Sequence, residues 1–457
     1  MNEKSQFSQL SDGEEGGHHS QFALLRERRF WPLFVTQFLG AFNDNIYKNA
    51  LMVLLTFGAV SWTTMRSEVL VNVAAGLFIL PFFLFSATAG QLADKFDKAR
   101  LARATKVLEI VIVLLAGVGF WLQSLSVLLA ALFLLGLQST LFGPVKYAIL
   151  PQHLRAGELV GGNALVEAGS FVAILCGTLA GGLLAGFDGG IAWIVAICLV
   201  AAVAGFLASC RIPAAPAPAP ELKIAVNFVV ESWRCIGFAS RERSVFLSIL
   251  GVSWFWLYGA LLLTQFPAYT KSALGGGEGM VTALLAVFSV GVGAGSLFCD
   301  RLTQRRGKAV EPGLVPLGAF GMAIFALDMA LVSPGNAAGA ELPLAELLCQ
   351  PGIWRVLLDL VMLGGFGGLY CVPLYALVQQ RSDVARRARV IAANNILNAL
   401  FMAIGAVGAA WYLGRGHSIP TLFLVMVGLH SLVTIYIFSV VPEFLVRALI
   451  WLGWRRE

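Results

Sequence analysis

The sequence contains the stretch Gly90-Gln-Leu-Ala-Asp94-Lys95-Phe-Asp-Lys98-Ala-Arg100, a short charged turn between two long apolar runs. A glycine at its start allows two helices to approach closely, because it has no Cβ. Asp94 is an anion of the kind that a neighbouring helix N-terminus attracts, and the cations Lys95 and Lys98 lie beside it. We therefore expect a clamp here that breaks when two packed parts of the protein move apart.

The composition on both sides of this turn is that of an integral membrane protein. Of 457 residues, 58% are hydrophobic and only 13% are charged, and the mean hydropathy is +0.79. A soluble domain carries roughly 25% charged residues.

A helix needs about 20 mostly apolar residues to cross the hydrocarbon core. Twelve runs of this kind occur in the sequence: 31–58, 68–92, 104–123, 125–150, 159–186, 190–210, 244–270, 280–300, 314–333, 354–379, 390–413 and 419–441.

The basic residues predict the topology. The formal net charge is +6, from 32 Lys and Arg against 26 Asp and Glu. Nearly all of these cations lie in the two tails and in the loops that follow the even-numbered runs. The loops on the opposite side contain only Arg66, Lys271, Arg355 and Arg415. Because positively charged short loops stay cytoplasmic, we expect both termini in the cytoplasm. Topology explains the basic excess, so no nucleic-acid partner is expected.

The runs divide the chain into two six-helix bundles, over 30–210 and 244–443. Residues 1–29 are polar and lack the apolar core of a signal peptide, so we expect a disordered cytoplasmic tail there and a second cytoplasmic tail over 444–457. The linker 211–243 opens with a proline-rich run that favours an extended spacer. Its remainder can form an amphipathic helix on the membrane surface.

The two halves repeat each other weakly. Leu141-Phe-Gly-Pro-Val-Lys-Tyr147-Ala-Ile-Leu-Pro-Gln152 matches Leu369-Tyr-Cys-Val-Pro-Leu-Tyr375-Ala-Leu-Val-Gln-Gln380 in phase, and the following runs start alike at Asn163 and Asn394. Transporters are commonly built from duplicated halves. We therefore predict an all-α protein of two pseudo-symmetric bundles. The other interpretation is a chance likeness between helices rich in Gly and Ala.

The first run carries the most informative polar residues. Asp44 lies about 20 Å of helical rise beyond Trp31, near the middle of the bilayer. Gln37, Asp44 and Lys48 share one stripe of the helix. Asparagines flank this stripe at Asn43, Asn45 and Asn49. An ionisable group at this depth is costly unless it faces a cavity or a partner. One interpretation is a hydrated pathway for a polar or zwitterionic group. The other is a structural Asp44–Lys48 pair that holds helices together.

A second set of polar residues enters the membrane from the cytoplasmic side. Lys146 and Glu167 can pair across two helices or contact a headgroup, and the alternative for Lys146 is snorkelling to the interface. The counterparts in the second half are uncharged: Asn394, Asn395 and Asn398. An apolar wall for a lipid tail can come from aromatic residues such as Tyr147 and Tyr375.

The remaining ionisable residues give no sign of an enzyme. Glu109 beside Lys106 and Asp359 beside Arg355 suggest structural pairs, and Asp328 has no evident partner. The seven cysteines are scattered without metal-ligand spacing, and the histidines are isolated. We therefore expect no catalytic group, no metal and no cofactor.

The turn at Gly90–Arg100 resembles the signature G-x-L-A-D-(R/K)-x-G-(R/K) of the major facilitator superfamily, with Asp97 in place of the second glycine. The resemblance implies the major facilitator fold of twelve transmembrane helices and transport by alternating access between the halves. On this basis Asp94 joins a basic residue at the start of run 390–413 when the cytoplasmic side is closed. The candidates are Arg386, Arg387 and Arg389.

Three further segments carry a narrower resemblance. They are Gln37-Phe-Leu-Gly-Ala-Phe-Asn-Asp44-Asn45, then Pro144-Val-Lys146-Tyr147 with Gly162-Asn163-Ala-Leu-Val-Glu167, and Gly367-Gly-Leu-Tyr-Cys-Val-Pro373. Together they are similar to the bacterial lysophospholipid transporter family, including the transporter part of its acyltransferase fusions. Asp44 and Lys146 fall on polar positions of the family motifs, whereas the arginine that members can carry in helix 7 has no counterpart between Ser253 and Pro267.

This resemblance implies a cargo, a location and a partner. Lysophosphatidylethanolamine and lysophosphatidylglycerol would move from the outer to the inner leaflet of the bacterial inner membrane, where a cytoplasmic acyltransferase or acyl-ligase reacylates them. We expect a monomer in contact with membrane lipids. Three alternatives remain open: a proton-coupled transporter of another small amphiphile or drug, a lipid-modifying membrane enzyme, and a longer chain with a catalytic domain after Arg456.

Overall fold

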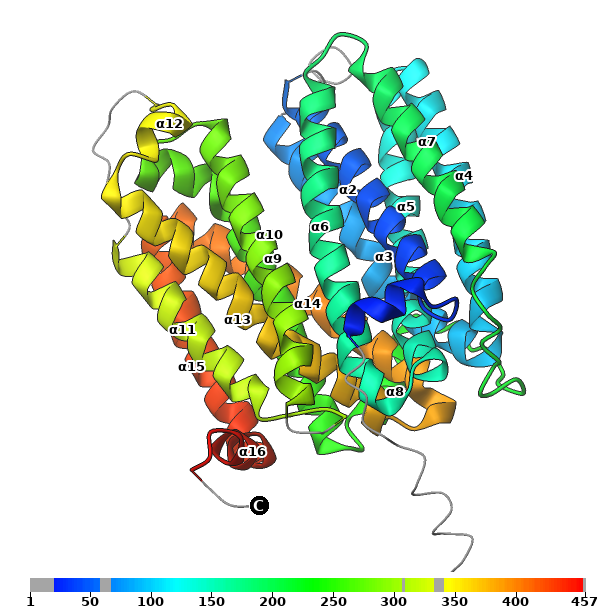
Figure 1. Ribbon diagram of the computed structural model, residues 1–457. Coiled ribbons are helices and arrows are strands. Elements are labelled where there is room, and N and C mark those ends of the chain that lie inside the picture. The colour runs from blue at the N-terminus through cyan, green and yellow to red at the C-terminus, as the bar shows by residue number, and fades with distance from the viewer. Residues whose placement is uncertain (1–19, 58–66, 306–308, 333–340, 455–457) are drawn as a thin grey trace, which may run out of the picture.

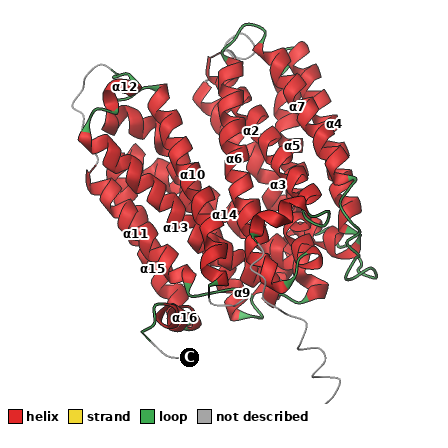
Figure 2. Ribbon diagram, viewed as in Figure 1, coloured by secondary structure: helices red, strands yellow, loops and turns green. Residues whose placement is uncertain are grey.

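The computed structural model describes residues 20–57, 67–305, 309–332 and 341–454, and the regular elements in these ranges are helices (Figure 2). Eleven helices are long and apolar enough to cross a membrane. Helix α2 (Trp31–Phe57), which carries the polar stripe of the first run, is a further helix of spanning length with 27 residues. The prediction of an all-α membrane protein with twelve long helices is confirmed.

Two bundles lie side by side in Figure 1. The first consists of α2, α3 (Ser67–Lys95), α4 (Lys98–Trp121), α5 (Leu125–His153), α6 (Leu159–Ala185) and α7 (Gly190–Ser209). The second consists of α9 (Arg243–Tyr269), α10 (Glu278–Gln304), α11 (Leu314–Val332), α13 (Pro351–Arg381), α14 (Arg387–Gly414) and α15 (Ile419–Val440). Shorter helices are η1 (Gln21–Arg26), η3 (Ala156–Glu158), α8 (Phe228–Ala239), η4 (Thr270–Leu274), α12 (Leu344–Leu347), η5 (Val384–Arg386) and α16 (Glu443–Trp451).

Glycines allow the closest helix contacts inside each bundle. A Cβ at Gly136 of α5 would lie 2.3 Å from the carbonyl oxygen of Phe78 in α3, and a Cβ at Gly295 of α10 would lie 1.9 Å from that of Gly365 in α13. These helix pairs occupy equivalent places in the two halves. Without a hydrophobic force between helices in lipid, such close backbone packing is a main source of association.

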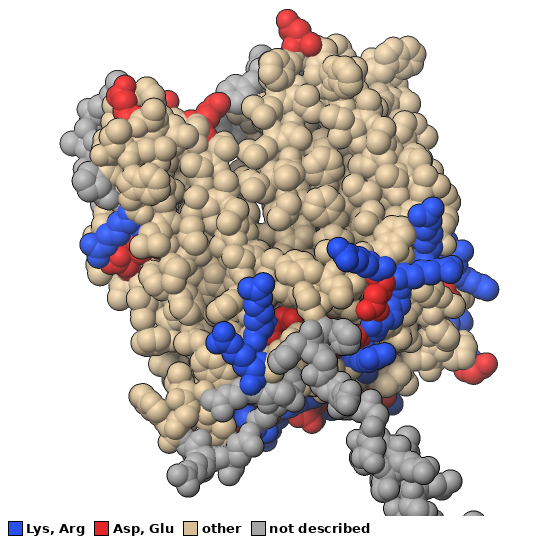
Figure 3. Space-filling view, viewed as in Figure 1, with Lys and Arg blue, Asp and Glu red and all other residues tan. Residues whose placement is uncertain are grey.

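Charge divides the molecule into two unlike ends. Most of the Lys and Arg side chains visible in Figure 3 gather at one end, which we name the basic end. It includes the turns around Lys98 and Arg386. The bundles touch there through α3 with α14 and through α6 with α10. At the other end the surface is hollowed between the bundles (Figure 3). The predicted loop cations Lys4, Arg66, Arg306, Lys308, Arg455 and Arg456 lie outside the described residues.

The N-terminal segment differs from the expected disordered tail. Residues 1–19 lie outside the described residues, but Gln21–Arg26 forms the 3-10 helix η1. Arg29 binds both carboxylate oxygens of Glu158, at 2.6 and 2.7 Å. Gln21 is 5% exposed and donates to the carbonyl of Leu297 in α10. These contacts tie the segment to both bundles, and a polar composition alone does not reveal them.

Candidate functional site

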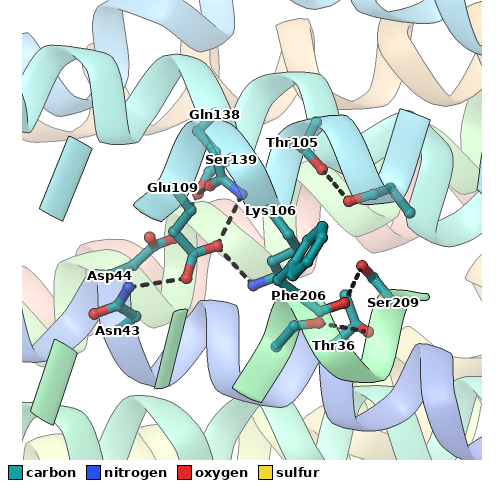
Figure 4. Close-up of polar contacts among 12 residues, drawn as sticks. Thr36, Asn43, Asp44, Thr105, Lys106, Glu109, Gln138, Ser139, Phe206 and Ser209 are labelled. Atoms are coloured by element: carbon teal, nitrogen blue, oxygen red, sulfur yellow. Dashed lines mark hydrogen bonds and ion pairs between the residues drawn. The ribbon is translucent and has the colours of Figure 1, made fainter. Parts of the chain in front are cut away.

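Asp44 lies on α2 among helices of the first bundle. Its carboxylate accepts a hydrogen bond from the Ser139 hydroxyl of α5, and its Oδ1 atom has no hydrogen-bond partner among the described residues. The neighbouring Asn43 is 1% exposed and donates a hydrogen bond to Glu109 of α4. Figure 4 shows these side chains with the network behind them.

A fully buried ion pair lies behind Asp44. The Lys106 ammonium is 2.6 Å from Glu109 Oε2, and both side chains are 0% exposed. Glu109 also accepts from Asn43 at 2.8 Å and from Gln138 at 3.0 Å. The pair itself was expected from the sequence. Its link to the Asp44 region through Asn43 and Gln138 was not, because those residues come from helices far apart in the chain (Figure 4).

Lys48 forms no ion pair with Asp44 in the described structure, which does not support the second interpretation of the stripe, a structural Asp44–Lys48 pair. Its ammonium donates to Asn45 Oδ1 at 2.9 Å and lies 5.5 Å from the centre of the Phe78 ring. Asp44 instead receives the Ser139 hydroxyl from across the bundle. Asp44 and Lys48 are therefore separate polar groups on one helix face.

The two bundles meet at a stacked pair of tyrosines. The Tyr147 ring of α5 lies 4.4 Å from the Tyr375 ring of α13, with 8° between their planes. Tyr147 donates to Glu167 of α6, and Tyr375 accepts from the Trp256 indole of α9 at 2.9 Å. Four residues from four helices thus form one chain across the interface. The repeat placed both tyrosines at matching positions, and their stacking follows from the pseudo-symmetry.

Lys146 and Glu167 form no ion pair in the described structure. The Lys146 ammonium lies 4.6 Å from the centre of the Tyr147 ring, where a cation meets the negative face of the aromatic system. Glu167 is 1% exposed, and its Oε2 atom has no partner among the described residues. The structure brings Lys146, Tyr147, Glu167 and Tyr375 into one cluster.

The amides predicted for this site differ in their contacts. Gln37 accepts a hydrogen bond of 3.1 Å from the Ser170 hydroxyl, and Asn398 accepts one of 2.7 Å from the Ser253 hydroxyl. Asn394 is 2% exposed, and neither of its side-chain polar atoms has a hydrogen-bond partner in the described part of the chain. Buried amides are normally satisfied. Asn395 lies against α5, since a Cβ on Gly143 would be 2.6 Å from its Nδ2 atom.

Asp94 fastens the bundles together at the basic end. It accepts from Arg389 Nε at 2.8 Å and from the Ala388 backbone N–H at 3.1 Å, so it meets both a cation and the N-terminus of α14. We call this contact the gate. A Cβ on Gly90 would lie 2.7 Å from Ala392 Cβ and 3.0 Å from the Ala388 carbonyl oxygen. The glycine therefore permits the close approach that the sequence predicted.

Other basic residues near the gate have different partners. Arg387 donates to the Ser382 carbonyl at 3.5 Å, and Arg386 lies 3.7 Å from Asp383. Lys95 lies over the Phe96 ring, and the buried Lys98 ammonium has no hydrogen-bond partner in the described ranges. Of the three arginine candidates, only Arg389 binds Asp94.

An amide pair joins the bundles a short way from the gate. Asn163 of α6 and Gln379 of α13 exchange two hydrogen bonds of 2.7 and 2.9 Å, and both are fully buried. In the second half, Asp300 occupies the place that corresponds to Asp94. It accepts from Gln304 at 2.7 Å and lies against Gly161 at the start of α6, with no arginine bound to it among the described residues.

Two charged contacts lie away from this interface. Arg355 binds Asp328 through two hydrogen bonds of 2.8 and 2.6 Å, while Asp359 keeps one carboxylate oxygen without a partner in the described residues. The expected Asp359–Arg355 pair is therefore replaced by Asp328–Arg355, because α11 presents its carboxylate to the guanidinium.

At the basic end, two hydrogen bonds from Arg381 hold the pKa of Glu443 below its usual value. The described residues contain no group of His, Cys, Asp and Glu suited to bind a metal.

Comparison with known proteins identifies relatives over most of the chain. The sequence model of the Major Facilitator Superfamily matches residues 33–406. The protein named lysophospholipid transporter LplT from Cronobacter sakazakii (strain ATCC BAA-894) is 29% identical over 426 residues, which are 89% of this chain and 89% of that protein. The protein of the same name from Salmonella arizonae (strain ATCC BAA-731 / CDC346-86 / RSK2980) is 28% identical over 431 residues, with 93% and 95% covered.

Solved structures share the fold. Two crystal structures of a bacterial homologue of the iron transporter ferroportin, both in the outward-facing state, superpose with TM-scores of 0.64 and 0.61 at 16% identity. They cover 89% and 90% of this chain, and 98% and 99% of their own chains are matched. At this identity the likeness establishes the fold and nothing about cargo.

Proposed function

The chain belongs to the major facilitator superfamily, and we propose that it moves lysophospholipids from the outer to the inner leaflet of the bacterial inner membrane. The proposed cargoes are lysophosphatidylethanolamine and lysophosphatidylglycerol. Relatives named lysophospholipid transporter over most of the chain support the cargo class. The observation that carries the proposal is the amphiphilic cluster buried between the bundles, where Lys146 and Glu167 adjoin the Tyr147–Tyr375 stack.

This cluster suits a molecule with one acyl chain and a charged headgroup. The Lys146 ammonium can meet the headgroup phosphate, and the free oxygens of Asp44 and Glu167 can accept from an ethanolamine or glycerol. When the bundles separate, the two stacked rings would become an apolar surface next to these groups. Helix 7 of the superfamily corresponds to α9, which has no cation between Ser253 and Pro267. Lys146 is therefore the proposed phosphate ligand.

The geometry suits a transporter closed on the cytoplasmic side. In this proposal the basic end is cytoplasmic, as the positive-inside rule favours, and the hollow faces the outer leaflet. Cargo enters from that side, and the gate, the Asn163–Gln379 pair and the tyrosine stack separate as the bundles rock about the central site. An acyltransferase or acyl-ligase in the cytoplasm then consumes the product.

Leaflet-resolved transport in proteoliposomes tests this function. Fluorescent lysophosphatidylethanolamine is added to the outer leaflet, and the fraction protected from a membrane-impermeant reductant is followed over time. We expect protection that depends on the protein and is reduced by unlabelled lysophosphatidylglycerol but not by diacyl phosphatidylethanolamine. No protection by a folded protein would contradict the proposed cargo.

A proton-coupled transporter of another small amphiphile is the second candidate. The observation that favours it is the pair of carboxylates in the membrane with a free oxygen, Asp44 and Glu167, since such groups commonly form proton relays. An internal pH dye in the same proteoliposomes distinguishes the two. Proton entry that starts on addition of a different amphiphile supports this candidate, and lysolipid transport indifferent to a pH gradient excludes it.

A further inference from the structure

Helix α8 lies directly on the gate. Its buried face, formed by Glu231, Cys235 and Ala239, is at most 6% exposed, and the helix packs against both α3 and α14. The Phe238 ring lies 5.0 Å from the guanidinium carbon of Arg389. This is the arginine that binds Asp94, so α8 contacts the gate through a cation–π interaction.

The segment that leads into α8 is also bound to the gate helices. Gln91 of α3 exchanges two hydrogen bonds with the backbone of Ala225, at 2.8 and 3.1 Å. The Ala219 N–H donates to the Asp94 carbonyl oxygen at 3.0 Å. Asp97, which replaces the glycine of the superfamily signature, accepts from the Ala215 N–H at 2.9 Å. The linker, for which its prolines predicted an extended spacer, is therefore fixed along the end of the first bundle.

The opposite face of α8 is apolar and exposed. Val229, Val230 and Trp233 follow one another at helical spacing and are 50%, 43% and 70% exposed, and Val226, just before the helix, is 87% exposed. Apolar faces of this kind mark interaction surfaces. Tryptophan is enriched at membrane interfaces, and the neighbouring Arg234 side chain is 60% exposed, as suits contact with anionic headgroups.

We infer that this outer face of α8, Val229 to Trp233, binds the cytoplasmic leaflet and that membrane binding keeps the gate closed. The lipid surface is the occupant because the face combines an exposed tryptophan with an exposed arginine, Trp233 and Arg234, on a helix that packs against the membrane-spanning helices α3 and α14. In the closed state, α8 lies on the gate. A membrane surface that binds α8 in this position stabilises the closed state, because binding and the conformation that it requires are thermodynamically linked. The inference concerns the gate and does not depend on which cargo is moved.

The first experiment asks what the outer face touches. A Val229→Cys variant is labelled with an environment-sensitive dye after the exposed cysteines Cys176, Cys210 and Cys349 are changed to Ser. The protein is reconstituted in vesicles of phosphatidylethanolamine with phosphatidylglycerol, with and without lipids that carry a quencher near the headgroup. We expect quenching by these lipids. Dye that stays accessible to an aqueous quencher and is untouched by the lipid quencher would overturn the inference and would assign the face to a protein partner.

The second experiment asks whether the contact controls the gate. Spin labels at Arg100→Cys and Arg301→Cys report the separation of the bundles at the basic end. We expect Trp233→Ser to raise the ratio of open to closed molecules about fivefold, the lower end of typical couplings. The expected effect depends on anionic lipid. Leu445→Ser in α16, which removes an apolar side chain that is 44% exposed away from the gate, should leave the ratio unchanged. An unchanged ratio in Trp233→Ser, or an equal change in Leu445→Ser, would overturn the inference even if the gate and the transport activity are as proposed.

Discussion

At the scale of single residues, the Lys106–Glu109 pair decides how α2 is held. Both charges are fully buried, and Asn43 and Gln138 bind the remaining carboxylate positions. A buried ion pair is favourable only when its hydrogen bonds are completed in this way. The network therefore fixes α2 against α4 and α5, and with it the position of Asp44.

Glu109→Gln should destabilise the protein strongly, because it leaves the Lys106 charge buried without a counter-ion. We expect a loss of about 3–5 kcal/mol, measured by chemical unfolding in micelles. Glu443→Gln is the matched control. It removes one partner of the Arg381 pair, whose side chains are 31% and 38% exposed, and should cost at most about 1 kcal/mol. Equal losses in the two variants would show that the Lys106–Glu109 pair has no special role.

At the scale of elements, we propose that the α3–α14 junction controls access from the basic end. The junction combines a charge, a helix N-terminus and a glycine contact. The sequence predicted that Asp94 meets a basic residue there, but not which one. That choice depends on where α14 begins, at Arg387, and on how α8 covers the arginines. Helix starts are uncertain by a few residues from sequence, and the docking of α8 is a long-range contact.

Asp94→Asn should shift the protein toward the state open at the basic end. The side-chain amide of this variant still has an oxygen that accepts a hydrogen bond from the Ala388 N–H, but it lacks the negative charge that binds Arg389. Spin labels at Arg100→Cys and Arg301→Cys should report more open molecules, while labelled lysolipid still binds. Loss of binding with an unchanged distance distribution would mean that Asp94 belongs to the substrate site and not to the gate.

Gly90→Ala should block full closure of the same junction, because its Cβ would lie within 3.0 Å of α14 atoms. We expect fewer closed molecules by the same distance measurement and a lower transport rate. Gly182→Ala on α6 is the control, since a Cβ there meets nothing within 4 Å. A closed population equal to that of the wild type in Gly90→Ala would show that the contact tolerates a methyl group.

At the scale of the whole molecule, the structure is closed at one end and hollowed at the other. Three layers close the basic end: the gate, the Asn163–Gln379 pair and the Tyr147–Tyr375 stack. Hydropathy and glycine patterns predicted the helices, because each must satisfy its own backbone in lipid. These patterns did not predict which end of the molecule is closed, because inward- and outward-facing forms share the same helices. The sequence also left open whether Asp44 pairs with Lys48, because the partner of Asp44, Ser139, comes from another helix.

We propose that Asp44 and Lys146 bind the headgroup of a lysolipid. The most direct measurement is the leaflet-resolved transport rate of labelled lysophosphatidylethanolamine for Asp44→Asn, Lys146→Ala and the control Asp328→Asn, with and without a proton gradient. A lost charge-assisted hydrogen bond predicts a decrease of about tenfold or more in the first two variants. We expect wild-type transport in the control and no effect of the gradient. Wild-type rates in all three variants, or no transport by the folded wild type, would contradict it.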